Sequence, residues 1–262
     1  MNSQRIWAVI YRHGCETRRN LNRVTDTLYW PAQNIIVWGF FTLYLARQNR
    51  LEPGVASYLL GATMLWGMFY SFQRDLATGF MEEMWSQNLL NLFSSPLSVS
   101  EYMTGLIAVN LGKAFFGLLI AALIGWFCYA ENLFVQLRGL LPFLLILIVF
   151  SLSIGLVITG LIIRFTTKVQ TLAWSFAGLL MPLSCVFYPA STLPAWLRPL
   201  AWALPTMHAF EGMRAMMMGG VFSVTHFAWG LGLGAVYFGL SIVFFRWMFA
   251  LARTRGFLAK QE

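Results

Sequence analysis

Six long apolar stretches are the feature that most limits how this chain can fold. They cover residues 28–46, 55–72, 103–129, 139–163, 170–189 and 227–250. A bilayer core about 30 Å thick needs roughly 20 apolar residues per helix, so each stretch is a candidate span. Backbone groups inside lipid must bond within their own segment, and continuous apolar runs therefore favour helices over barrel strands. We expect an all-α membrane protein with six transmembrane helices.

Composition excludes the main soluble classes. Of 262 residues, 58% are hydrophobic and 11% are charged, whereas soluble domains have about 45–50% and about 25%. A cytosolic enzyme and a disordered protein are excluded on this ground. The net charge of +8 does not indicate nucleic-acid binding, because the basic residues lie between apolar stretches. Three cysteines are too few and too scattered for a disulfide framework or a zinc site.

The positions of Lys and Arg predict the orientation. An even number of spans places both termini on one side of the membrane. That side carries twelve of the eighteen basic residues, the opposite loops carry five, and Lys113 lies within the third span. Because cytoplasmic loops are enriched in Lys and Arg, we expect both termini in the cytoplasm.

Three segments outside the spans have distinct patterns. Residues 1–27 precede a six-span domain over 28–262. One helical face of this segment is basic, which predicts an interfacial helix or, alternatively, an ordinary basic flank. In the connection between the second and third spans, residues 73–102, an apolar stripe predicts an amphipathic helix over about 79–95, with Glu82 and Glu83 near its start. Such a helix either transmits force to a partner or simply covers the bundle. The stripe is Met81, Trp85, Leu89 and Leu92.

The third segment with a distinct pattern follows the fifth apolar stretch and begins within it. Five of the nine prolines fall between residues 182 and 205, in a sequence too apolar for a solvated loop. Proline interrupts helices, so a single span is excluded here. We expect short half-helices that re-enter the outer leaflet over about 189–220.

A search for catalytic or nucleotide-binding motifs is negative. A P-loop requires Gly, four residues, then Gly-Lys-Ser/Thr, but Gly112-Lys113 is followed by Ala114, and Ile107 stands where the first glycine belongs. The three histidines show no metal-ligand spacing. We therefore expect no catalytic residue, cofactor site or metal site. Asn110 and Lys113 make a polar face in the third span, which indicates a translocation path or, alternatively, a lysine that snorkels to the interface.

Two segments resemble the permease subunits of the ABC type-2 exporter family. One runs from Glu82-Glu83 through Leu89-Leu90 to Ser95-Pro96-Leu97-Ser98. The other contains Ser184–Pro189, Leu193–Leu197, Leu204-Pro205, His208-Ala209 and Glu211–Arg214. The resemblance extends over the whole chain in the number, order and length of spans. Phe80-Met81 departs from the family pattern, where Gly or Arg precedes the acidic residues.

The resemblance implies a half-transporter in the bacterial cytoplasmic (inner) membrane. Two copies would form the path and two ABC ATP-binding subunits would bind ATP and Mg, whereas this chain would bind no cofactor or nucleic acid and would contact membrane lipids. The coupling helix would place Glu82, Glu83, Trp85, Leu89 and Leu90 against the ATPase. The outer gate would contain Pro189, Pro194, Trp196 and Pro205. The alternatives are a channel or ion-coupled carrier, which requires mid-membrane ionisable residues, and a polytopic membrane enzyme.

Overall fold

The computed structural model describes residues 1–48, 54–129 and 133–254, and every regular element in those ranges is helical. The elements, in chain order, are α1 (Ser3–Arg19), α2 (Leu21–Arg47), α3 (Val55–Trp85), α4 (Leu89–Ser94), α5 (Val99–Tyr129), α6 (Leu133–Phe165), η1 (Thr166–Val169), α7 (Leu172–Leu180), η2 (Ala190–Thr192), α8 (Arg198–Trp202), α9 (Pro205–Gly219) and α10 (Val224–Thr254).

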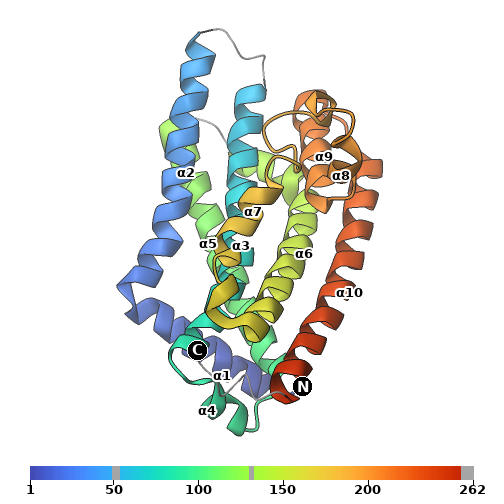
Figure 1. The fold of residues 1–262 in the computed structure, drawn as a ribbon. Helices are drawn as coiled ribbons and strands as arrows, with labels where there is room; N and C mark the ends of the chain where they lie inside the picture. The colour runs from blue at the N-terminus through green and yellow to red at the C-terminus, as the bar shows by residue number, and fades with distance from the viewer. Residues whose placement is uncertain (49–53, 130–132, 255–262) are drawn as a thin grey trace.

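The long helices form one bundle with two different ends. Figure 1 shows α2, α3, α5, α6 and α10 running along the bundle, with α1 and α4 at one end and α8 and α9 at the other. We call these the α1 end and the α9 end. The last turn of α10 lies at the α1 end, so the first and last described helices lie at the same end of the bundle (Figure 1). This arrangement agrees with an even number of passes along the bundle.

Four helices of the described chain are long and apolar enough to cross a membrane: α3, α5, the 140–165 part of α6, and α10. The predicted fifth span over 170–189 is wrong as a continuous helix, because α7 ends at Leu180 and turns follow. Pro182 lacks an amide hydrogen, and Cys185 has a left-handed φ of 52°, so neither continues a helix. The count of six transmembrane helices stays a prediction.

The predicted amphipathic helix over about 79–95 is divided in two. The helical hydrogen bonds of α3 continue to Trp85, and a turn then separates α3 from the six-residue α4. Gln87 has a φ of 56° in this turn, a left-handed conformation that ends a helix. Glu82 and Glu83 therefore lie in the last turn of α3, so the expectation that they begin a helix is wrong.

The N-terminal segment is a separate helix that lies against α5. Asn2 caps α1, because its side-chain oxygen accepts a hydrogen bond from the Gln4 amide at 3.0 Å. Val9 is buried at the contact, and a Cβ atom built on Gly105 would come within 2.7 Å of the Val9 side chain. Glycine at position 105 therefore permits the close approach. The basic face predicted for one helix is shared, since α1 ends at Arg19 and Arg23 belongs to α2.

Proline positions explain the short helices at the α9 end. Pro199 and Pro205 occupy the first turns of α8 and α9, where the missing amide hydrogen has no intrahelical partner to lose. The predicted half-helices over about 189–220 correspond to η2, α8 and α9, of which α9 packs on α6 and α10. Their re-entry into an outer leaflet stays a prediction.

Candidate functional site

A cavity of about 680 Å³ lies between α2, α3, α5 and α7. It extends from His13 on α1 to Phe187 beyond α7, so it follows the bundle for much of its length. The walls combine aromatic rings with charged groups, which is the composition of a site that holds both apolar and polar parts of a ligand. The aromatic lining residues are Trp30, Trp38, Trp66, Tyr70, Trp85, Trp174 and Phe187.

One aromatic part of the cavity wall joins α2 to the segment after α7. Trp38 stacks on Phe187 with ring centroids 4.5 Å apart and planes 20° apart. Offset stacking of this kind contributes about 0.5–1.5 kcal/mol beyond area burial. The stacked pair therefore holds the irregular segment after α7 beside the cavity.

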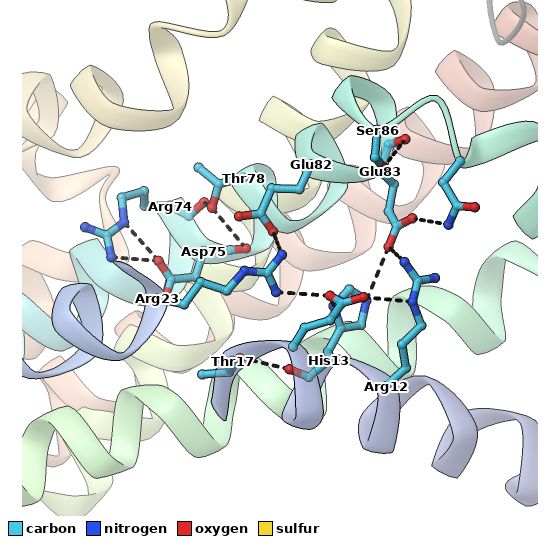
Figure 2. A network of polar contacts seen from close by, with 12 residues as sticks. Arg12, His13, Thr17, Arg23, Arg74, Asp75, Thr78, Glu82, Glu83 and Ser86 are labelled. Carbon is cyan, nitrogen blue, oxygen red and sulfur yellow. Dashed lines mark hydrogen bonds and ion pairs between the residues drawn. The ribbon is translucent and has the colours of Figure 1, made fainter. Parts of the chain in front are cut away.

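The charged part of the cavity lies toward the α1 end, and its carboxylates on α3 are ion-paired. Glu82 accepts from Arg23 at 2.6 Å, and Asp75 accepts from Arg74 at 2.7 Å. Figure 2 shows both pairs, with Arg23 from α2 reaching across to α3. Each cation of these pairs is thus already neutralised inside the chain.

Asn110 and Lys113 line this cavity from α5, so the structure brings together the two residues that the sequence singled out in the third span. At 1.5 Å per residue, Lys113 lies about 21 Å from the first residue of α5. A cation at the centre of a lone span costs about 2.5–3.5 kcal/mol on insertion. A polar cavity lowers that cost, because the ammonium group keeps water or a polar ligand beside it.

The second feature at the α1 end is an ion-pair network that holds α1 against α3. Arg12 donates to Glu83 at 2.7 Å and to Glu16 at 2.9 Å, and Arg23 donates to Glu16 at 3.1 Å. His13 lies between the same carboxylates, with Nδ1 3.3 Å from Glu16 (Figure 2). Three parts of the chain therefore converge in this network: α1, the start of α2 and the end of α3. Helix α5 packs against all three helices.

Burial and charge set the protonation of the α1 side of this network. Burial lowers the pKa of His13 below its ordinary value; the two arginines act in the same direction, and the glutamates oppose them. Partial burial by itself would raise the pKa of Glu16, but His13, Arg12 and Arg23 hold that pKa below its usual range. These directions favour a neutral His13 imidazole beside an ionised Glu16 carboxylate.

His13, Glu16 and Glu83 are also the one group in the described ranges whose possible metal-ligand atoms all lie within 4.8 Å of one another. The two arginines already occupy both carboxylates. A divalent cation at this point would face two guanidinium charges, so these residues do not fit a metal ion.

The residues expected at an ATPase contact have different environments. Glu83 is buried, and its second carboxylate oxygen accepts from Asn88 at 2.7 Å. Glu82 is partly exposed and paired as described above, Trp85 is 53% exposed, and Leu89, the first residue of α4, is buried. The side chain of Leu90 lies outside the described part. Of this set, Trp85 is the large apolar surface that a partner could contact directly.

A third polar cluster fixes the irregular segment at the α9 end. Arg214 donates to the Tyr58 hydroxyl at 2.6 Å and to the carbonyls of Cys185 and Tyr188 at 2.8 and 2.9 Å. Its guanidinium also lies 2.7 Å from Glu211 and 4.7 Å from the centre of the Tyr58 ring. Sequence reasoning did not select Tyr58, because nothing in the pattern of α3 indicates its partner.

Of the expected gate residues, Pro189 lies next to this cluster. Glu211 accepts from the amide of Ala190 at 2.6 Å, directly after Pro189. Pro189 and Pro194 are exposed, Pro205 is buried, and Trp196 is 72% exposed. Trp196 thus presents its ring outward from the α9 end.

A helical bundle with long apolar spans defines a class, that of helical integral membrane proteins. The particular family follows from a comparison: a model of the ABC-2 type transporter family matches residues 14–218, and the chain belongs to this family. It is a membrane-embedded permease component of an ABC transporter and not itself an enzyme; such permeases normally work with an ATP-binding subunit. No curated protein matches the chain.

Proposed function

We propose that this chain is the permease subunit of an ATP-driven exporter in the bacterial inner membrane. Two copies form the translocation path, and two separate ATP-binding subunits supply the energy. The observation that carries the proposal is the family match together with a sequence that contains no P-loop. ATP and Mg are then held by the partner, and this chain binds neither.

The partner docks at the α1 end. Trp85 offers an exposed ring beside α4, and burial of an exposed tryptophan contributes strongly to protein interfaces. Glu82 and Glu83 act indirectly in this proposal, because their ion pairs to Arg23 and Arg12 fix α1 beside the docking surface. Closure of the ATPase pair moves this end as a rigid body.

The substrate occupies the cavity that Asn110 and Lys113 line, and it leaves through the α9 end. Trp196, with Pro189, Pro194 and Pro205 around it, forms the outer gate. The exposed ring of Trp196 packs against the second copy or the membrane surface.

Co-expression of the chain with its candidate ATP-binding subunit tests the proposal. Wild-type chain should copurify with that subunit, and the complex, not the chain alone, should hydrolyse ATP. Trp85→Ala should weaken copurification by about tenfold, the scale of a tryptophan hot spot. Trp196→Ala is the control, since it removes an exposed tryptophan ring at the opposite end.

The proposal fails if the purified chain hydrolyses ATP by itself. It also fails if reconstituted chain conducts ions or carries solute without any ATP-binding subunit, which would identify the channel or ion-coupled carrier instead. Loss of transport with retained assembly in Trp196→Ala is the expected behaviour of a gate residue.

A further inference from the structure

Two nitrogen donors on one face of α5 have no acceptor in the described chain. Asn110 and Lys113 are three residues apart, so they lie one above the other on the helix. The Asn110 side chain belongs to a residue only 2% exposed, and its Nδ2 atom makes no hydrogen bond to the residues that the structure describes. Buried amides almost always have a partner, so this one indicates a group supplied from outside the chain.

Lys113 makes no close ion pair in the described ranges, although Asp75 and Glu82 lie near enough to attract its charge. None of the seven lysine or arginine ion pairs found within 4.0 Å in the described ranges includes Lys113. The two carboxylates of α3 that line the cavity with it, Asp75 and Glu82, are each engaged by an arginine at 2.7 and 2.6 Å. The remaining lining carboxylate, Asp26, is exposed at the start of α2 and accepts from Trp30.

The chemistry of these donors limits what can satisfy them. An ammonium group and an amide NH₂ both donate, so the ligand must present lone pairs, and the positive charge favours an anionic oxygen. The surrounding tryptophans offer stacking and apolar surface to whatever the anionic group is attached to. Phosphate and carboxylate groups meet these requirements, whereas a quaternary ammonium group meets neither.

We propose that Asn110 and Lys113 form an anion-binding subsite that receives a phosphate or carboxylate group of the transported molecule, with the tryptophans of the cavity holding the rest of that molecule. The inference rests on the proposed transport function, because it names the substrate class of the same cavity. The anionic group belongs either to the headgroup of an amphiphile or to a soluble anion, and the test separates these sources.

The experiment uses two probes with the same bromoalkyl tail, one with an anionic head that accepts hydrogen bonds and one with a cationic head that does not. Full-length chain in phosphatidylcholine nanodiscs is titrated with 12-bromododecyl phosphate and with 12-bromododecyl trimethylammonium. Bromine quenches tryptophan fluorescence on close contact, so the rings of the cavity report binding. We expect saturable quenching by the phosphate probe and only non-saturating quenching by the ammonium probe. Equal quenching by both probes in the wild-type chain overturns the proposal without any variant.

The variants then test the two residues. Lys113→Gln should weaken apparent affinity for the phosphate probe by about tenfold or more, as expected for loss of a charge-assisted hydrogen bond. Lys113→Arg should retain the binding, and Asn110→Leu should reduce it at similar volume. Lys168→Gln, which removes an exposed lysine on η1, is the control and should bind as wild type. Unchanged affinity in both Lys113→Gln and Asn110→Leu overturns the subsite.

Competition with sodium phosphate identifies the source. Full displacement of the bromododecyl phosphate at millimolar phosphate assigns the subsite to a soluble anion. Retention of the probe assigns the subsite to an amphiphile headgroup, because the alkyl tail of the probe is then required for binding. None of these measurements includes an ATP-binding subunit, so failure of the subsite and failure of the proposed function give different results.

Discussion

At the scale of single residues, Arg214 is a largely buried side chain that satisfies irregular backbone near the α9 end. It bonds two carbonyls of the segment after α7 and the hydroxyl of Tyr58. Arg214→Gln should leave these groups without a donor, at a cost of about 1–3 kcal/mol for each buried group. We expect a lower melting temperature and faster chymotrypsin cleavage near Phe187 and Tyr188.

Arg198 supplies the control for that prediction. It makes comparable bonds to the carbonyls of Leu193 and Ser191, but it is exposed. Water replaces those bonds in Arg198→Gln, so its melting temperature should remain near that of the wild type. Equal destabilisation by both substitutions would show that Arg214 has no special role in holding the segment.

His13 predicts how α1 responds to acid. Burial lowers the pKa of His13 in the folded state, so the unfolded or undocked segment binds a proton more readily. The contribution of neutral His13 to the stability of docked α1 is therefore complete above the ordinary histidine pKa of about 6.5. This contribution is lost as the pH falls below that pKa. Groups facing the ring are Arg12, Glu16, Arg23, Glu83 and Tyr102.

Fluorescence anisotropy measures this response. A pH-insensitive dye on Cys15, in a Cys128→Ser background, should report greater mobility of α1 when the pH is lowered from about 7.5 to about 5.5, across the ordinary histidine pKa. His13→Gln should make the anisotropy independent of pH over that range. A wild-type anisotropy that does not change, or a change that persists in His13→Gln, contradicts the assignment.

At the scale of elements, the contact between α1 and α5 depends on Gly105. A side chain there meets Val9 within 2.7 Å and the Ile6 carbonyl at 3.2 Å. Gly105→Leu should therefore displace α1 and break the Arg12–Glu83 pair. We expect trypsin to cleave after Arg18 and Arg19 several times faster than in the wild type, because undocked helices fray.

Gly112→Leu on the same helix is the matched control. A Cβ atom at Gly112 meets nothing within 4 Å, so this substitution should leave cleavage at α1 unchanged. If both leucines accelerate cleavage equally, the effect comes from α5 itself and not from the contact with α1. Copurification of the ATP-binding subunit, measured on the same pair, then reports whether docked α1 is needed at that interface.

Sequence patterns predicted long helices well, and they failed where pairing over distance decides the structure. Apolar length alone predicts α3, α5, α6 and α10, because a lipid-spanning helix satisfies its own backbone. The end of α3 was mispredicted, since Glu82 and Glu83 resemble the charged start of a new helix. Their partners, Arg23 and Arg12, are 59 and 71 residues away, and no local periodicity contains that information.

The same limit applies to the cavity. The polar pair on α5 was visible in the sequence, because Asn110 and Lys113 interrupt an apolar stretch. The walls opposite them come from α2, α3 and α7, and their convergence depends on packing that a single sequence does not encode in any short pattern.

At the scale of the whole molecule, the two ends should lie on opposite sides of the membrane. Single cysteines introduced at Asn20, Thr192 and Thr254, in a background with Cys15 and Cys128 replaced by serine, test this in intact cells. An impermeant maleimide should label Thr192→Cys, which lies in η2 beside α8, and should leave the other two unlabelled until the cells are opened. Labelling at Thr254 from outside contradicts the predicted orientation.

One uninterrupted helix joins these two ends. Tyr58, beside Arg214, and Glu83, beside Arg12, are both residues of α3, about 38 Å apart at 1.5 Å per residue. A helix without a break resists bending and stretching, so it behaves as a stiff rod. Tilting it by a few degrees at one end necessarily carries the other end sideways. Any push delivered near Glu83 would therefore reach the backbone around Tyr58 as a displacement, with no chemical messenger and no relay of side chains in between.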